Sequence, residues 1–155
     1  MNRNRNFFRG GGVILYDKYG VWLLNEKRKN KFYLIDFGGV FDNQTDKCIE
    51  DTICREFNEE TYYKYNISKD ILLKNNFYVI IHQNYNKNSF YKCYLINIKD
   101  LNIKKLDNSL IKHNENNFYK VSFKLLFNST FIRNHLHKRL KLILSNNKIK
   151  QFISL

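Results

Sequence analysis

The sequence predicts an α/β domain in which several strands pack with two helices, and three observations support this class. Short apolar segments rich in Val, Ile, Tyr and Phe recur between turn-forming residues, as in strands. Two other segments repeat apolar residues every third or fourth position, as in amphipathic helices. At 155 residues, 43% of them hydrophobic, the chain is long enough for one core. We therefore expect a single domain over residues 1–155, with residues 1–9 as a flexible basic arm.

The first part of the chain predicts three strands separated by turns. Residues 10–17 and 20–26 are apolar strands joined by a tight turn, and residues 31–36 form another strand. Between them, residues 26–31 are expected to form a basic loop. Residues 37–46 begin with Phe-Gly-Gly and are rich in turn formers, which indicates a second loop.

A helix is expected from residue 46 to about residue 62, capped by Thr45 or Asp46. Its buried face carries an apolar residue at every fourth position: Ile49, Ile53 and Phe57.

The second part of the chain predicts a hairpin, a strand and a final helix. Residues 75–85 and 89–98 are two long strands of a hairpin, and residues 99–116 are a polar connection. Residues 117–123 form a short strand. An amphipathic helix follows over 129–146, and its inward face consists of Phe131, Ile132, Leu136, Leu140, Ile143 and Leu144.

The composition argues against several classes of protein. The longest apolar runs are far shorter than the roughly 20 residues that a membrane-spanning helix needs, and the N-terminus lacks an apolar signal segment. We therefore expect a cytoplasmic protein with no membrane partner. Three cysteines without a close C-x-x-C pair argue against a disulfide framework or a zinc site. Many Asn, Lys, Ile and Tyr residues, whose codons are rich in A and T, and no proline are typical of an AT-rich genome, such as that of a large virus or a parasitic eukaryote.

The charge is unevenly distributed along the chain. The net charge is +13, yet eight of the 14 acidic residues lie between positions 36 and 60, where the basic residues are Lys47 and Arg55. Such a field suits a cation held in an acidic patch and an anion held by a basic rim. Charge alone leaves a second interpretation open, which is a solvated acidic helix.

The sequence REFNEE at 55–60 makes the cation the better explanation. Glu56, Glu59 and Glu60 have spacings i, i+3 and i+4, so they share one face of the helix. Carboxylates in a last turn oppose the helix dipole and repel one another, and Arg55 offsets only part of this through Glu59. Hard divalent cations prefer clustered carboxylate oxygens. The cluster therefore predicts a metal site.

The segment GGVFDNQTDKCIEDTICREFNEET resembles the Nudix box, G-x5-E-x7-R-E-U-x-E-E-x-G-U, where U is aliphatic. REFNEE matches its core, with Phe57 at the apolar position. The glycine-rich first strand and the glycine pair before the box are also similar to that family, so the resemblance covers nearly the whole chain. It implies an α/β/α sandwich with a mixed β-sheet between helices.

Three departures distinguish the segment from the usual box. The loop between Gly39 and Arg55 is two residues longer, Lys47 stands where glutamate is usual, and Tyr62 replaces a glycine. Asp46 lies beside Lys47 and is a candidate for the role of the missing glutamate. The three core glutamates are intact, so we expect activity.

The resemblance implies a hydrolase that cleaves a nucleoside diphosphate linked to another moiety, by water attack on phosphorus. The expected cofactor is Mg²⁺ or Mn²⁺, held by Glu56, Glu59, Glu60 and the carbonyl of Gly38. Arg55 would orient the glutamates, and one glutamate would act as general base. Glu115 is a candidate for a further carboxylate, with Asp46 as another, and a surface loop residue is the alternative interpretation of Glu115.

Substrate class stays open at this stage. Lys27, Arg28 and Lys29 are candidates for phosphate binding, against the alternative of a solvated loop. A free nucleotide or dinucleotide suits the compact chain, whereas the 5′ cap of mRNA suits the basic body. Inositol pyrophosphates are a third option. The altered box also leaves a non-enzymatic alternative, which is a module that binds nucleotide or RNA without cleaving it.

Overall fold

The computed structural model describes residues 8–75, 77–82, 89–103 and 117–153. Most of the basic arm and the candidate Glu115 lie outside these ranges. The strands are β1 (Phe8–Tyr16), β2 (Gly20–Arg28), β3 (Lys31–Ile35), β4 (Phe37–Val40), β5 (Tyr78–His82), β6 (Phe90–Asn97) and β7 (Asn117–Ser122). The helices are α1 (Ile49–Glu60), α2 (Lys69–Lys74), the 3₁₀ turn η1 (Ile98–Leu101), α3 (Phe123–Asn128), α4 (Thr130–His135), α5 (Lys138–Leu144) and α6 (Asn147–Ile153).

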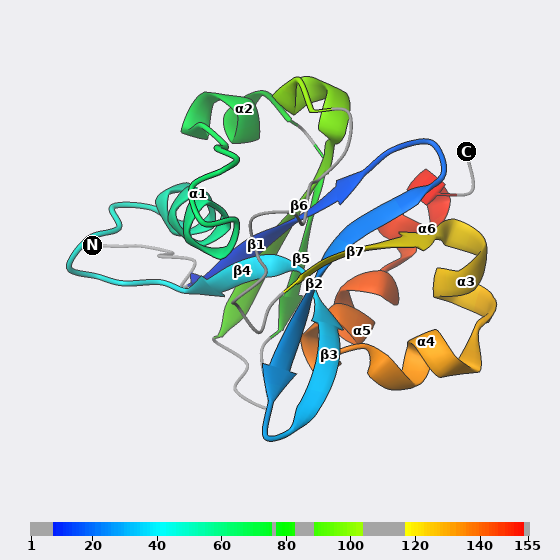
Figure 1. Ribbon diagram of the computed structural model, residues 1–155. Coiled ribbons are helices and arrows are strands. Elements are labelled where there is room, and N and C mark those ends of the chain that lie inside the picture. The colour runs from blue at the N-terminus through cyan, green and yellow to red at the C-terminus, as the bar shows by residue number, and fades with distance from the viewer. Residues whose placement is uncertain (1–7, 76, 83–88, 104–116, 154–155) are drawn as a thin grey trace.

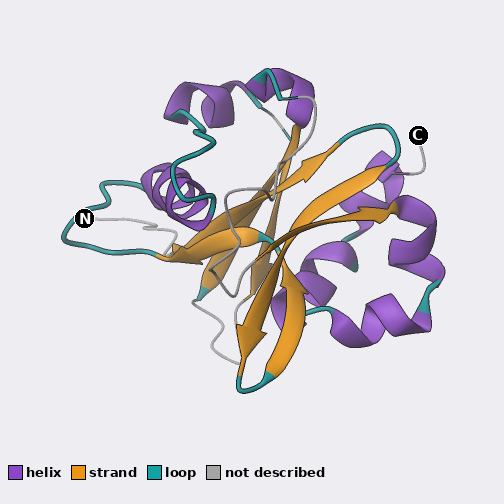
Figure 2. Ribbon diagram, viewed as in Figure 1, coloured by secondary structure: helices purple, strands orange, loops and turns teal. Residues whose placement is uncertain are grey.

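In the described ranges the strands form one mixed sheet between two layers of helices (Figure 1). Its main path is β3-β2-β1-β6-β5, with β4 paired to β1 and β7 paired to β2. The β1–β6 pair is parallel, and the other pairs are antiparallel. Helices α1 and α2 lie on one face and α3–α6 on the other (Figure 2). The predicted α/β fold with a mixed sheet is confirmed.

The sheet forks next to α1. At its C-terminal end β1 pairs with β2 through Leu15 and Tyr16, whereas its N-terminal half, from Gly10 to Val13, pairs with β4. Strands β3 and β4 fill the fork as nearly one extended segment, in which β3 pairs with β2 and β4 with β1. The segment changes partner at Asp36, which is fully buried.

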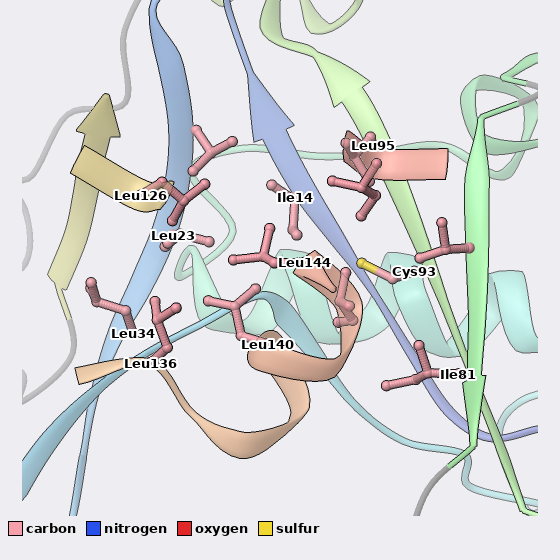
Figure 3. Packing of buried hydrophobic residues seen from close by; sticks show 14 of the residues in the cluster. Ile14, Leu23, Leu34, Ile81, Cys93, Leu95, Leu126, Leu136, Leu140 and Leu144 are labelled. Atoms are coloured by element: carbon pink, nitrogen blue, oxygen red, sulfur yellow. The ribbon is translucent and has the colours of Figure 1, made fainter. Parts of the chain in front are cut away.

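Alternation of side chains along the strands produces two apolar layers. On the α1 face, strand residues such as Val13, Leu24 and Phe37 pack against Ile53 and Phe57. The opposite face packs against α5, and the labelled residues of that layer in Figure 3 include Ile14, Leu23, Leu34, Leu140 and Leu144. At about 25 cal/mol per Å² of buried apolar surface, these two layers are the main source of stability.

Two predicted loops are partly strands. The expected basic loop 26–31 is the tip of the β2–β3 hairpin, which turns at Lys29 and Asn30 with φ values of 48° and 63°. Both residues of such a two-residue turn take positive φ, which lets it follow the twist of the strands. Within the expected loop 37–46, residues 37–40 form β4, because the edge of β1 offers them backbone partners.

The predicted helix over 129–146 is wrong in its continuity. It is broken into α4 and α5, because Leu136 is extended and forms a bridge to Leu34. The N–H of Leu136 closes α4 by donating to the carbonyl of Arg133 at 3.3 Å. Leu136, Leu140, Ile143 and Leu144 are buried as predicted, but Phe131 is 70% exposed. The helices α2, α3 and α6 were not predicted.

The hairpin of β5 and β6 and the strand β7 agree with the sequence-based expectation. In the part of the chain that is described, no helix combines the length and apolar character needed to cross a membrane.

Candidate active site

Helix α1 presents its last turns to β4. Ile49, Ile53 and Phe57 are at most 7% exposed, and α1 packs on β1 and β4, as the four-residue apolar repeat predicts. The N-cap is Cys48 and its side chain makes no capping bond, so the expected cap by Thr45 or Asp46 is wrong. Instead, the carboxylate of Asp51 accepts a hydrogen bond from the Lys47 N–H at 2.9 Å.

Arg55 is the centre of the polar contacts around the helix. Its Nε and Nη2 donate to the two carboxylate oxygens of Asp46 at 3.1 and 2.9 Å, a bidentate arrangement. Nη1 donates to Glu56 Oε1 at 3.0 Å and lies 3.7 Å from Glu59. Nη2 also donates to the carbonyl of Val40 at 3.1 Å. Arg55 thus fixes the glutamates to the loop that precedes the helix.

Asp46, the candidate for the role of the missing box glutamate, forms this ion pair with Arg55. Its carboxylate also accepts hydrogen bonds from the N–H of Asp42 at 3.0 Å and the hydroxyl of Thr52 at 2.8 Å. Burial alone would raise the pKa of Asp46, but the bonds from Arg55 and its other donors outweigh burial and lower that pKa to about 2. Since these donors occupy both oxygens, Asp46 organises the longer loop around Arg55.

We expect Asp46→Asn to remove a pH-dependent part of the stability. The pKa of Asp46 falls from an ordinary 3.8 to about 2 on folding, so its contribution is complete above pH 3.8 and is lost as the pH falls through about 2. The shift corresponds to roughly 2 kcal/mol of unfolding free energy. Denaturant unfolding should show this deficit at neutral pH and almost none near pH 2. A constant deficit at every pH would contradict the prediction.

Glu60 and Glu56 lie against the backbone of β4. Glu60 is partly buried, and its Oε1 accepts a hydrogen bond from the Gly38 N–H at 2.7 Å. Burial raises the pKa of Glu60 well above its ordinary value, and the charges of Asp36 and Glu56 raise it further. Burial also raises the pKa of Glu56, and it outweighs the lowering effect of Arg55. Negative charge is therefore under-compensated at this end of α1.

The C-terminal end of α1 uses a Schellman motif. The N–H of Tyr63 donates to the carbonyl of Asn58 at 2.7 Å and that of Tyr62 to Glu59 at 3.0 Å. Tyr62 and Tyr63 both have positive φ, 54° and 60°. Tyr62 thus adopts the left-handed conformation that glycine usually provides at this position. With Tyr62 in place of glycine, the motif keeps its hydrogen bonds but has a higher conformational free energy.

Gly39 lets the Glu56 carboxyl group approach the backbone. A Cβ atom at Gly39 would lie 2.3 Å from Cδ of Glu56 and 2.4 Å from its Oε1. At Gly38 a Cβ atom would instead meet the hydroxyl of buried Tyr91 at 2.1 Å and the carbonyl oxygen of Gly11 at 2.5 Å. Gly39 therefore makes room for a flexible side chain, whereas Gly38 makes room for a buried hydroxyl group and the backbone of β1.

From this difference we expect Gly39→Ala to lose activity while keeping its fold. Glu56 can rotate away from the new methyl group, but its carboxylate then leaves its position, and a shift of 1 Å can reduce turnover about a hundredfold. Gly38→Ala is the matched variant, and it should lose about 1–3 kcal/mol because backbone must move. Thermal melting and turnover of the two variants check this. Equal melting temperatures would contradict the assignment.

The donor set fits a hard divalent cation, because it offers carboxylate oxygens and the partly buried backbone of a glycine pair. Across the described residues, however, no three His, Cys, Asp or Glu side chains are already gathered as ligands of one ion. Glu56 and Glu59 turn to Arg55, and Glu60 turns to the Gly38 N–H. A cation would therefore compete with Arg55 for Glu56.

Of the candidate phosphate-binding residues, Arg28 is held by an ion pair. Its Nε donates to Glu26 at 2.7 Å, and the charge of Glu26 contributes to the raised pKa of Glu60. Arg28 also lies 3.1 Å from Nε2 of His137. Lys27 neighbours Arg28 in β2, where alternation turns it to the other face of the sheet, and Lys29 lies in the turn. The structure does not bring the three basic side chains together.

Sequence reasoning missed two buried ionic networks. Asp36 accepts a hydrogen bond from the Tyr91 hydroxyl at 2.5 Å and one from Nε of Arg139 at 2.9 Å. Glu50 accepts one from Lys92 at 2.7 Å and one from the Tyr94 hydroxyl at 2.8 Å. The available signal was a charged residue inside an apolar strand, as in KFYLIDF and FYKCYLIN.

Comparison with known proteins supports the fold. No protein-family model matches the sequence, and neither does any curated protein. NrtR from Shewanella oneidensis is similar in structure, with a TM-score of 0.50 and 14% identity. A bifunctional NMN adenylyltransferase/ADP ribose pyrophosphatase from Francisella tularensis has a TM-score of 0.52 and 15% identity. Both contain a Nudix domain.

The fold is of the Nudix type. The similarity covers 94% and 91% of this chain, whereas the chain spans only 63% and 41% of the length of these two proteins. Identities this low establish the fold alone, so the activity must be argued from the site.

Proposed function

We propose that the protein is a metal-dependent pyrophosphohydrolase that cleaves a nucleoside diphosphate linked to another moiety. One observation carries the proposal. Two of the three carboxylates at the end of α1 lie beside the glycine backbone of β4, with Glu60 bonded to the Gly38 N–H and Glu56 against Gly39. The third, Glu59, shares Arg55 with Glu56. Burial and mutual repulsion raise the pKa of two of them, which is the environment that a divalent cation relieves.

Each residue has a distinct role in this proposal. Glu56, Glu59, Glu60 and the Gly38 carbonyl would hold Mg²⁺ or Mn²⁺. When bound, such an ion neutralises phosphate charge and lowers the pKa of a bound water. Arg55 keeps Glu56 and Glu59 oriented through its anchors at Asp46 and Val40. One of the glutamates accepts the proton of the attacking water, and the three carboxylates titrate as a coupled group.

The substrate phosphates would meet the β2–β3 hairpin at Arg28, which pairs with Glu26 at 2.7 Å. Arg28 is about half exposed and would meet the phosphates as a charge-assisted donor. A free nucleotide or dinucleotide is the substrate class that we propose. The strongly basic chain also suits a capped RNA or an inositol pyrophosphate, and a substrate panel separates these.

The test is hydrolysis of a mixed panel with Mg²⁺ or Mn²⁺ by wild type, Glu59→Gln and Asp51→Asn. The panel holds NTPs, dNTPs, oxidised purine nucleotides, dinucleoside polyphosphates, an inositol pyrophosphate and cap-labelled RNA. Glu59 is the cleanest probe because its side chain is 46% exposed and pairs with Arg55 at the surface of the helix. Asp51 is the control, since it is a carboxylate at the other end of α1. We expect metal-dependent cleavage that Glu59→Gln loses and Asp51→Asn keeps.

A second candidate function is binding of nucleotide or RNA without cleavage. It is favoured by the observation that the described carboxylates are not gathered around one point but turn to Arg55 and Gly38. Cleavage of nothing in the panel, together with saturable binding of one member, would replace the hydrolase proposal with this one. Binding of capped RNA should then weaken steeply with added salt.

A further inference from the structure

We propose that Asp36, Tyr91 and Arg139 act as a positioning network that holds Gly38, and through it Glu60, in place. The contribution to catalysis rests on the proposed function, whereas the positioning itself does not. The three residues come from distant parts of the chain. Asp36 joins β3 to β4, Tyr91 lies in β6 and Arg139 lies in α5.

The network is a buried ion pair with an added hydroxyl. Asp36 and Tyr91 have no exposed surface, and the Arg139 side chain is 13% exposed. The two carboxylate oxygens of Asp36 are shared out: Oδ2 accepts from Tyr91 at 2.5 Å and Oδ1 from Arg139 at 2.9 Å. The guanidinium of Arg139 also lies over the Tyr91 ring, 4.5 Å from its centroid. Each member thus contacts both others.

This network lies directly under the glycine of the candidate site. Asp36 is two residues before Gly38, at the point where the segment leaves β2 for β1. The Tyr91 hydroxyl covers the α-carbon of Gly38, since a Cβ atom there would fall 2.1 Å from it. The N–H of the same glycine donates to Glu60 at 2.7 Å. A shift of Asp36 or Tyr91 is therefore passed to Gly38 and to the carboxylate bonded to it.

Stability alone gives no reason for such a network. A buried ion pair is often no more stabilising than apolar residues of equal volume, although loss of one partner is costly. What the ion pair does provide is direction, because hydrogen bonds fix the angle at which β3 becomes β4, whereas apolar packing does not. Arg139 also anchors α5 to the opposite side of the sheet from α1.

The protein contains a matched control. Glu50, Lys92 and Tyr94 form a second buried trio with the same chemistry, a carboxylate that receives one cation and one tyrosine hydroxyl. It lies on the α1 face of the sheet, at the first turn of α1, whereas the atoms that would crowd a Cβ atom at Gly38 belong to Tyr91, Gly11 and Gly12. Lys92→Met leaves a buried carboxylate without its cation, as Arg139→Met does. Tyr94→Phe likewise matches Tyr91→Phe.

The experiment measures amide hydrogen exchange of Gly38 by NMR, together with thermal melting and Mn²⁺ affinity, in the four variants. We expect the Gly38 amide to exchange at least about tenfold faster in Arg139→Met than in Lys92→Met, and in Tyr91→Phe than in Tyr94→Phe, after correction for differences in global stability. Their Mn²⁺ affinity should fall about 10- to 100-fold, which is the range for groups that orient metal ligands. Lys92→Met and Tyr94→Phe should lower the melting temperature but leave both quantities near wild type.

Equal Gly38 exchange in Arg139→Met and Lys92→Met would overturn the proposal, because both lesions would then act only through global stability. If Arg139→Met does not fold, Tyr91→Phe decides the question, since it removes one hydroxyl and keeps the ring. If the wild-type protein cleaves no substrate, the proposed function is refuted, but the positioning network is not. The exchange measurement needs neither metal nor substrate and still tests the network.

Discussion

Glu60→Gln is expected to reduce kcat about 10²- to 10⁴-fold, the range for loss of a catalytic acid–base group, while the protein becomes no less stable. Glutamine is isosteric, and its carbonyl oxygen can still accept the Gly38 N–H at 2.7 Å. The variant removes a partly buried carboxyl group whose charged form is disfavoured by burial and by Asp36 and Glu56. Activity and stability should therefore change in opposite directions, which is common at functional sites.

The pH dependence of stability shows why Glu60→Gln should be at least as stable as the wild type. Folding raises the pKa of Glu60 well above the ordinary 4.5, so its effect on stability is absent below pH 4.5 and unfavourable as the pH rises through the folded pKa. Thermal melting of wild type and Glu60→Gln across this range should coincide in acid and then separate, with the variant melting higher. A variant that melts well below wild type at neutral pH would contradict this account of Glu60.

Arg55→Met is expected to be the most destabilising change at the site, at about 3–5 kcal/mol of unfolding free energy, as for breaking a buried pair. Asp46 is 3% exposed at its side chain and would lose both of its Arg55 bonds, and Val40 would lose a donor. Denaturant unfolding at neutral pH measures the effect. Turnover should fall as well, because Glu56 loses its orienting partner.

A double-mutant cycle that combines Arg55→Met with Asp46→Asn tests whether the loss of stability comes from the unpaired Asp46 carboxylate. If the cost arises from an unpaired Asp46 charge, the double variant should recover about 0.5–3 kcal/mol relative to the sum of the single changes. Simple additivity would assign the effect to lost packing of the arginine chain.

Local patterns were sufficient to predict α1 and the glutamate cluster. The repeat through Ile49, Ile53 and Phe57 defines a buried face, and side chains at 56, 59 and 60 then follow from helix geometry alone. The hairpin of β5 and β6 is also local, because a short connection joins two apolar runs. The pairing of Arg55 with Glu59 was predicted for the same reason.

What the sequence did not reveal depends on contacts between distant residues. Asp36 and Arg139 are 103 positions apart, so no local period connects them. The break between α4 and α5 is hidden for the opposite reason. Leu136 keeps its helical spacing to Leu140 and Ile143, yet it is extended because Leu34 offers it a strand partner. Periodicity identifies a buried face without showing whether the backbone is continuous.

The Schellman motif after α1 has a consequence for the stability of the last turn of the helix. A residue other than glycine costs roughly 1–2 kcal/mol in the left-handed region, and Tyr62 and Tyr63 both occupy it. The final turn, which carries Glu59 and Glu60, is therefore held against the conformational preference of the residues that close it. A cation shared between Glu56 and Glu60 would tie this turn to the preceding one, so occupancy of the site and integrity of the helix end would rise together.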